Sequence, residues 1–182
     1  MTLDLTLSPL HRINGQESSS MPGLVVMKPP RKTGRGREQD RLVAYLLLTG
    51  NASFSSAEYT QIVSDAANVF YQSSGSLTSA LRLAAESINH KLLERNMSTS
   101  GRGQYALGWL TLAVLRESQC TLLLSGPMHV YWLGHGSVRH FYEPGLSGKG
   151  LGLSQTATIH YAQNALQAGD RLLFCGKVEI LL

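Results

Sequence analysis

The side chains that could act as nucleophiles or metal ligands are few. Cys120 and Cys175 lie in apolar runs far apart in the sequence and form no C-x-x-C motif. A nucleophilic cysteine needs a neighbouring base and a lowered pKa, and the sequence indicates neither, so we expect both cysteines to pack in the core. His129, His135 and His140 fall within one predicted hairpin, but not at a recognised spacing of metal ligands. We expect these histidines on the hairpin surface.

Motifs of the common hydrolases are absent from the sequence. The glycine-containing loop 145–152 holds Lys149, but it lacks the G-x4-G-K-[S/T] pattern that cradles phosphates. The twelve acidic residues are scattered, and no Ser or Cys lies in a nucleophile elbow. The sequence therefore favours neither P-loop nor glycosidase nor protease chemistry.

Composition predicts one folded domain with a basic N-terminal arm. Of the 182 residues, 43% are hydrophobic and 15% are charged, which excludes disorder along the whole chain. The net charge is +4, and residues 1–41 contribute +3 of it, with seven Lys or Arg against four acids. Residues 42–182 hold nine Lys or Arg against eight acids. The folded part is thus nearly neutral and lacks the basic face of a nucleic-acid binder.

The sequence also bears on the cellular compartment. No window reaches the roughly 18 to 20 uninterrupted apolar residues that cross a bilayer, and the first residues do not form a basic segment followed by an apolar one. Two cysteines without a pairing pattern fit a reducing compartment. We therefore expect a cytoplasmic protein that does not associate with membranes.

The first half of the chain is predicted to contain an arm, a buried strand and two helices. Clusters of Pro, Ser and Lys over residues 1–33 predict a flexible basic arm. The apolar run over 42–48, closed by a Thr-Gly-Asn turn, is typical of a strand buried on both faces. A capping-box pattern S-x-x-E begins a helix over 55–72, and a second apolar stripe predicts a helix over 77–95.

The second half alternates between apolar runs and short polar or glycine-containing turns, which predicts an antiparallel meander. The predicted strands are Ala106–Leu115, Cys120–Leu124, His129–Leu133 and Ser137–Tyr142, followed by shorter ones over 157–162 and 171–175. One strand, two helices and then many strands predict an α+β fold, a layered β-sandwich of mainly antiparallel sheets flanked by paired helices.

The order of these elements resembles the metal-dependent protein serine/threonine phosphatases, the PPM or type 2C family, over roughly residues 34–178. Arg35 is followed five residues later by Asp40, then by a buried strand that ends in Thr49-Gly50, then by two long helices and the meander. The resemblance implies a phosphatase-like domain over residues 34–182.

Two segments further along the chain support the resemblance. Residues 125–133, SGPMHVYWL, resemble the Gly-Asp-Ser-Arg-x-Tyr-Leu hairpin of the family, and residues 167–175, QAGDRLLFC, resemble its pGDrlLLcSDG segment. No counterpart of the family's last strands, with their Gly-x-x-Asp-Asn metal motif, follows before Leu182. The resemblance thus implies a domain that is incomplete at the C-terminus. Either a longer gene product supplies the last strands, or a partner covers the exposed sheet edge.

The family's chemistry rests on carboxylates that hold two divalent ions, Mg or Mn, which activate a bridging water. This chain has Gln39-Asp40 where the family has Glu-Asp, and Thr49-Gly50 where the family has Asp-Gly. The Asp of the family's Cys-Ser-Asp-Gly motif aligns with Lys177. At about 4 Å an ammonium repels a divalent cation by several kcal/mol, even at an effective dielectric of about 20. The resemblance therefore implies a degenerate site without a metal cofactor.

Two cations could retain a role at this site. Arg35 takes the place of the arginine that contacts phosphate in the family, and a guanidinium suits a bidentate phosphate contact. Its alternative role is that of one more solvated charge of the arm. Lys177 would lie beside Asp40 in the family's layout and could form an ion pair that replaces the metal. Its alternative is an ordinary surface lysine.

The favoured interpretation is a pseudophosphatase, a degenerate PPM-type domain with no catalytic residue and no cofactor. It would act as a binding or regulatory module for a protein partner. The alternative is an active metal-dependent phosphoserine/phosphothreonine phosphatase that holds Mg or Mn with ligands from elsewhere in the fold. A third possibility is a nucleic-acid binder that uses the basic arm.

Overall fold

The computed structural model describes residues 4–13, 15–18 and 21–176, and its elements follow the predicted order from β4 onward. The elements are β1 (Arg12–Ile13), β2 (Gln16–Glu17), β3 (Leu24–Met27), β4 (Arg41–Gly50), α1 (Ser56–Gln72), α2 (Leu77–Thr99), a 3-10 turn (Ser100–Arg102), β5 (Ala106–Arg116), β6 (Gln119–Ser125), β7 (His129–Gly134), β8 (Ser137–Phe141), α3 (Pro144–Ser147), β9 (His160–Ala165) and β10 (Arg171–Cys175). The short strand predicted over 157–162 thus lies three residues later.

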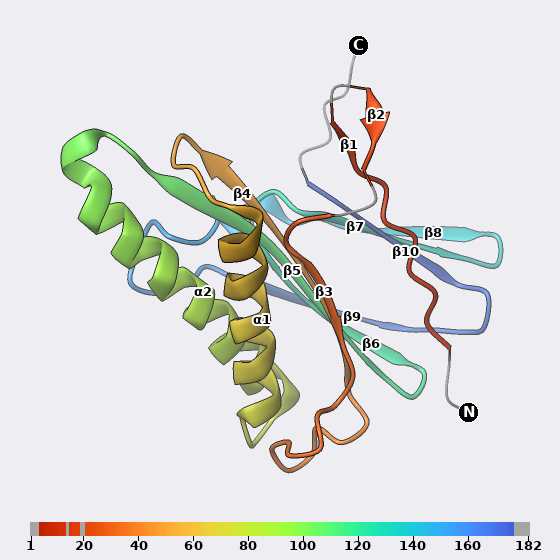
Figure 1. Ribbon diagram of the computed structural model, residues 1–182. Helices are drawn as coiled ribbons and strands as arrows, with labels where there is room; N and C mark the ends of the chain where they lie inside the picture. The colour runs from red at the N-terminus through yellow and green to blue at the C-terminus, as the bar shows by residue number, and fades with distance from the viewer. Residues whose placement is uncertain (1–3, 14, 19–20, 177–182) are drawn as a thin grey trace.

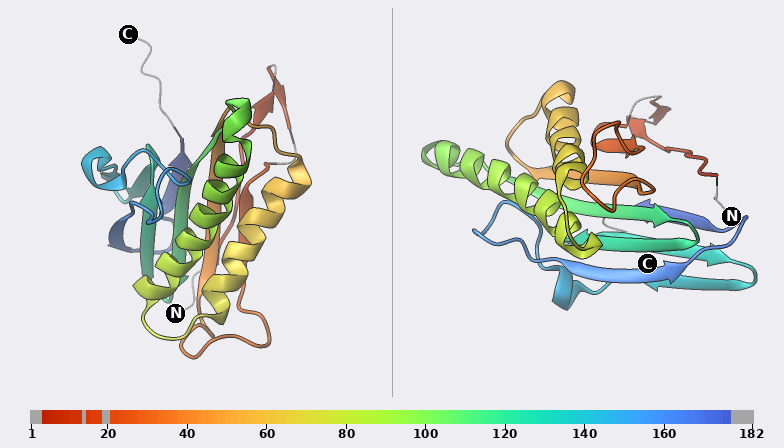
Figure 2. Two further views of the ribbon diagram at one scale, coloured as in Figure 1. Left: turned by 90° about the vertical axis from the view of Figure 1, so that its left-hand side faces the viewer. Right: turned by 90° about the horizontal axis from the view of Figure 1, so that it is seen from below.

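The fold has three layers. Helices α1 and α2 pack side by side on one face of a five-stranded sheet with the order β3-β4-β5-β6-β9 (Figures 1 and 2). A three-stranded sheet, β10-β7-β8, packs on the other face, and every pairing in both sheets is antiparallel. This confirms the predicted α+β class with mainly antiparallel sheets. None of the described helices is both long and apolar enough to cross a membrane.

Strand β4 belongs to both hydrophobic cores because its side chains alternate between the two faces of the sheet. Leu42, Ala44 and Leu46 face the helices and are 0% exposed. Val43 and Tyr45 face the three-stranded sheet and are 2% and 7% exposed. The continuous apolar run therefore forms a strand buried on both faces, as predicted.

Two tyrosines of α1 fix the two ends of β4. The Tyr71 hydroxyl lies 2.7 Å from the carbonyl oxygen of Met27, at the end of β3, and accepts a hydrogen bond from the Leu42 amide at 3.2 Å. The Tyr59 hydroxyl binds one carbonyl and one amide near the other end of β4, at 2.7 and 2.6 Å. Burial raises the pKa of Tyr59 to about 12, so its hydroxyl remains a donor at neutral pH.

The predicted arm ends earlier than residue 33. Leu24–Met27, which the sequence assigned to the arm, forms β3 and pairs with β4 at the edge of the five-stranded sheet. The reason is that Val25 and Met27 pack against the helix-side core. Four apolar residues between Pro22-Gly23 and the following prolines are thus long enough to make a strand. Flexibility of the rest of the arm stays a prediction.

The loop between β3 and β4 is fastened by a buried ion cluster. Asp40 is 0% exposed, and its carboxylate accepts hydrogen bonds from Arg37 Nη1 at 3.2 Å and from Arg116 Nε and Nη2 at 2.6 and 3.0 Å. Arg37 is 1% exposed and also donates from Nη2 to the carbonyls of Gly75 and Ser76, at 2.8 and 2.7 Å. The cluster therefore ties the loop to the α1–α2 turn and to the end of β5.

Both long helices begin at serine caps. Ser55 and Glu58 form the predicted capping box, in which the serine hydroxyl accepts from the Glu58 amide while the glutamate accepts from the Ser55 amide. Ser76 caps α2 in the same way through the Ser79 amide, but without a glutamate partner. These caps satisfy backbone groups that each helix leaves unpaired.

The buried cluster makes Asp40 a stability residue. Asp40→Asn leaves the buried Arg37 without its counter-charge, so we expect the free energy of unfolding to fall by roughly 3 kcal/mol. Urea unfolding followed by circular dichroism measures the loss. Asp65→Asn is the matched control, because Asp65 pairs with Lys91 on the surface, where such pairs contribute less than about 1 kcal/mol. Equal losses in the two variants would contradict this assignment.

The capping box predicts a pH effect at Glu58. Hydrogen bonds from Ser55, together with Arg95, lower the pKa of Glu58 from 4.5 to about 2. A lowered pKa stabilises the folded state above the unfolded value, so this contribution is lost as the pH falls from 4.5 toward 2. In an NMR titration of the side-chain carboxyl, Ser55→Ala should raise the pKa of Glu58, whereas Ser76→Ala should not. An unchanged value in Ser55→Ala would refute the assignment.

Candidate functional site

Strand β10 ends beside β4, three residues before the end of β4 at Gly50. A Cβ atom on Gly176, which follows β10, would lie 3.5 Å from Leu47 and 3.8 Å from Trp109. Leu47 and Trp109 are directly paired across β4 and β5. This is where the resemblance places the loops that carry metal ligands.

The indole of Trp109 fills this region. Cβ atoms on Gly126 and Gly150 would lie only 2.6 and 2.9 Å from the indole Cδ1, so the backbone approaches the ring where no side chain intervenes. The indole Nε1–H is buried and has no acceptor within the described residues. The space between the strand ends is thus occupied by an aromatic ring.

Thr49 and Gly50 end β4 in an uncharged turn. Gly50 has a φ of 112°, and a Cβ there would lie 2.4 Å from the carbonyl oxygen of Tyr105. The Asn51 side chain closes the turn, since its Oδ1 accepts from the Tyr105 amide at 2.8 Å and its Nδ2 donates to the Gly103 carbonyl at 3.0 Å. The turn offers one hydroxyl and no carboxylate. That Thr49 and Gly50 occupy former metal positions stays a prediction.

A segment that the sequence assigned to the arm runs beside this end of β4. The Gly23 carbonyl accepts from the Leu46 amide at 2.9 Å, just before β3 begins. A Cβ on Gly23 would lie 2.2 Å from the Leu46 carbonyl oxygen, and its φ is 81°, so the position requires glycine. The Pro-Gly pair before an apolar run was the available signal. This segment also brings no carboxylate, because Met21, Pro22 and Gly23 are uncharged.

Arg35, Gln39 and Asp40 lie at the opposite end of the sandwich. Asp40 precedes the ten-residue strand that Gly50 ends, so an extended rise of about 3.3 Å per residue separates the two by roughly 30 Å. Arg35 and Gln39 are exposed in the loop before Asp40. The expectation that Asp40 adjoins the Thr49 turn is therefore wrong. Because Asp40 and Thr49 lie at opposite ends of the same extended strand, they cannot meet at one site.

The pair between Asp40 and Lys177 stays a prediction, and two observations on the described residues bear on it. Lys177 lies outside the described residues, but Gly176 packs against Leu47, seven residues along β4 from Asp40. That spacing amounts to about 23 Å in an extended strand. Asp40 has its counter-charges in Arg37 and Arg116 instead. The charge of Asp40 is therefore balanced by Arg37 and Arg116.

The histidines of the β7–β8 hairpin form a surface ring cluster. His129 Nδ1 lies 3.0 Å from His140 Nε2, and each imidazole stacks on a tyrosine, Tyr142 at 4.0 Å and Tyr131 at 4.2 Å between ring centroids. Partial burial and the neighbouring His140 lower the pKa of His129. His135 is exposed at the turn. No group of three or more potential metal ligands occurs among the described residues.

Both cysteines are free thiols, and neither has the environment of a nucleophile. Cys120 is fully buried in the core between the sheets, and burial raises its pKa to about 12. Burial also raises the pKa of Cys175. Both thiols therefore remain protonated at neutral pH. Cys120 packs in the core as predicted, whereas Cys175 is half-buried.

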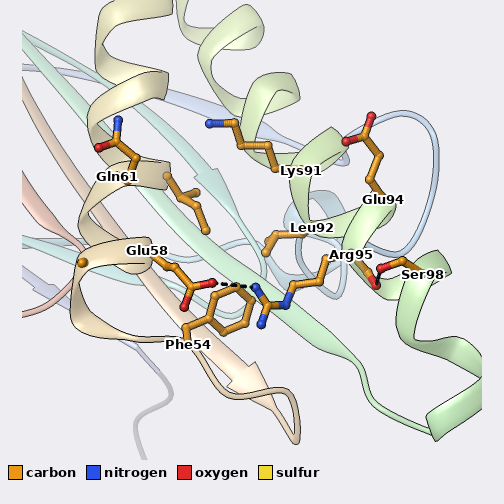
Figure 3. Close-up of a pocket in the computed structure, with 10 residues that line it drawn as sticks. Phe54, Glu58, Gln61, Lys91, Leu92, Glu94, Arg95 and Ser98 are labelled. Atoms are coloured by element: carbon orange, nitrogen blue, oxygen red, sulfur yellow. Dashed lines mark hydrogen bonds and ion pairs between the residues drawn. The ribbon is translucent and has the colours of Figure 1, made fainter.

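A cavity of about 750 Å³ opens between α1 and α2 (Figure 3). Its lining residues include Phe54, Ile62 and Leu92, and Arg95 spans it by pairing with Glu58 at 3.1 Å while its guanidinium lies 4.2 Å from the centre of the Phe54 ring. The lowered pKa of Glu58 keeps this carboxylate ionised at neutral pH, so it cannot serve as a general acid there. The groove thus holds an ion pair that links the two helices.

The residues at the meeting of β4 and β10 do not fit a pair of divalent ions. Mg²⁺ and Mn²⁺ prefer carboxylate, carbonyl and water oxygens. The described residues there supply one threonine hydroxyl, glycine backbone and an indole. Such a set can pack and bind weakly, but it lacks the negative charge that holds and positions a metal pair.

The sequence matches no family model and no curated protein. Its structure nevertheless matches solved bacterial phosphatases. Stp1, a serine/threonine phosphatase of Staphylococcus aureus, superposes with a TM-score of 0.61 at 11% identity, over 92% of this chain and 75% of that chain. The serine/threonine phosphatase PstP/Ppp of Mycobacterium tuberculosis gives a TM-score of 0.57 at 17% identity, over 84% and 76% of the two chains.

A third match is PppA of Pseudomonas aeruginosa, described as a key regulatory component of T6SS, with a TM-score of 0.56 at 16% identity over 86% of this chain and 70% of that chain. The catalytic domain of PstP, 18% identical, has been solved in complex with two manganese ions. Identities this low establish likeness of fold. The chain therefore has the fold of the metal-dependent protein serine/threonine phosphatases, the PPM or type 2C family.

Proposed function

We propose that this chain is a pseudophosphatase, a PPM-type fold that acts by binding a protein partner. The observation that carries the proposal is the chemistry where β4 meets β10. Among the described residues there, Thr49, Gly50 and Gly176 bring no carboxylate, and the Trp109 indole lies beside Gly176. Because these described residues bring no negative charge, we expect the fold not to hold the two divalent ions on which phosphate hydrolysis by this fold depends.

The position of Asp40 supports the proposal. Its carboxylate is buried at the far end of β4, and both of its oxygens accept hydrogen bonds from arginines. An oxygen engaged by a guanidinium is a poor ligand for a cation, because the neighbouring positive charge opposes metal binding. The acidic residue that the family resemblance singled out therefore has a structural role.

The outer face of the three-stranded sheet supports a binding role. Leu133 pairs with Val138, and Leu173 pairs with Tyr131, so the apolar side chains are contiguous across the strands. Leu133, Val138 and Leu173 are 36%, 67% and 53% exposed. Helices α1 and α2 cover the other side of the sandwich (Figure 2). Contiguous exposed apolar surface is typical of protein interaction sites.

The cysteines and one structural relative agree with this proposal. Two free thiols suit a reducing compartment such as the cytoplasm, where we place the protein. PppA, which shares the fold, is described as a regulatory component. In a regulatory role without metal chemistry, the fold would serve as a surface that binds a partner protein.

The proposal predicts no metal-dependent hydrolysis. The purified chain should release no product from an aryl phosphate or a phosphoserine peptide when Mn²⁺ or Mg²⁺ is added, because no carboxylates position the ions. The catalytic domain of PstP, assayed in parallel, shows that the assay works. Any background turnover should be the same without metal and in Thr49→Val. Turnover that rises with Mn²⁺ and falls in Thr49→Val would contradict the proposal and favour an active phosphatase.

A further inference from the structure

The net charge of the chain is concentrated in one loop. Residues 28–41, which join β3 to β4 and include the first residue of β4, contain six Lys or Arg and two acids, and so carry +4. The other 168 residues hold ten Lys or Arg and ten acids, and so are neutral. We call residues 28–41 the basic loop. It accounts for the whole formal charge of the protein.

The backbone of the basic loop is held in place. Thr33 Oγ1 and the Gly34 amide both donate to the carbonyl of Tyr71, at 2.9 and 2.6 Å. On the other side, Arg116 Nη2 donates to the Gly36 carbonyl at 2.8 Å. The loop therefore lies against the end of α1 at the lower end of the molecule in Figure 1. Little backbone entropy is lost when a loop that is already ordered binds a partner.

The cations of the loop differ in burial, and Arg41, the first residue of β4, is half-buried. Arg37 is buried, and its Nη1 and Nη2 bind Asp40 and two backbone carbonyls inside the protein. Lys28, Arg31 and Lys32 are exposed, and they make no hydrogen bond or ion pair with any residue that the structure describes. Arg35 is exposed as well, near Glu38, whose pKa is lowered mainly by backbone hydrogen bonds and less by Arg116 and Arg35. Three unpaired cations thus project within five residues from a fixed backbone.

We propose that the basic loop docks an acidic segment of a partner protein, an extended stretch rich in Asp and Glu. Lys28, Arg31 and Lys32 make the contacts. Opposite charge across an interface speeds association and selects against partners of like charge. This inference rests on the proposed binding function and specifies the chemistry of the partner.

The composition of the loop favours an acidic peptide over other polyanions. Residues 28–41 contain no aromatic side chain on which a nucleic-acid base could stack. They contain no Leu, Ile, Val, Met or Phe that could anchor in a lipid bilayer. Three unpaired cations cover few phosphates of a duplex, whose binding grows with the number of phosphates neutralised. A short acidic segment needs only a few such contacts.

The test is fluorescence anisotropy in metal-free, low-salt buffer with a labelled peptide of alternating Asp and Ser. The control peptide has Asn in place of every Asp. The full chain should bind the Asp peptide and not the Asn peptide, and binding should weaken as salt is added, because salt screens exposed charges. The triple variant K28Q/R31Q/K32Q should bind at least about tenfold more weakly.

The matched control variant is R102Q/K149Q/R171Q, which removes three exposed cations elsewhere and changes the net charge by the same amount. Its affinity should stay within about twofold of the wild type. Unfolding midpoints show that both triple variants fold, which we expect because the replaced side chains are exposed. Equal losses in both variants would mean that net charge alone acts, and would overturn the docking site.

Two further results would overturn the proposal. The first is failure of the Asp peptide to bind at low salt. The second is tighter binding to single-stranded DNA, or to vesicles containing phosphatidylserine, than to the Asp peptide, since each would assign the loop to a different partner. The peptide assay contains no metal and measures no hydrolysis, so its failure is distinct from that of the pseudophosphatase assignment.

Discussion

The carboxylate of Asp40 lies inside the protein without access to solvent, and its charge has to be balanced there. Arg37 and Arg116 supply the balance, and through them the loop before β4 is tied both to the α1–α2 turn and to the end of β5. This cluster fixes where β4 begins. It also holds the backbone of the basic loop, in which Lys28, Arg31, Lys32 and Arg35 are exposed.

Much of the fold could be predicted from local patterns. The apolar run of β4, the capping box at Ser55 and the two helical stripes each report on their own neighbourhood, so the elements and the α+β class followed. Strand β3 could not be placed in this way, because Leu24–Met27 becomes a strand only by pairing with β4. Pairing between distant segments is a tertiary effect that a short apolar run does not reveal.

The candidate site was predicted less well than the fold. Gly176, the residue after Cys175, lies beside Leu47 of β4, whereas the roles of Thr49, Gly50 and Lys177 at a former metal site stay predictions. The order of the family's motifs placed Asp40 at the same site, but this order takes no account of the ten residues of β4 that separate Asp40 from its end. The arginine partners of Asp40 come from residues 37 and 116, and Trp109 enters from β5. Only the three-dimensional arrangement brings these arginines to Asp40 and, at the other end of the sandwich, Trp109 to the end of β10.

The central claim is that the end of the sandwich where β4 meets β10 does not hold a divalent metal pair. NMR spectra of the ¹⁵N-labelled chain during a Mn²⁺ titration test it most directly, because Mn²⁺ broadens the signals of nearby nuclei, and Mg²⁺ serves as the diamagnetic control. The account predicts that the amides of Thr49 and Gly50 and the indole N–H of Trp109 broaden no more than amides elsewhere on the surface. Selective loss of these signals at low Mn²⁺ concentration would contradict it.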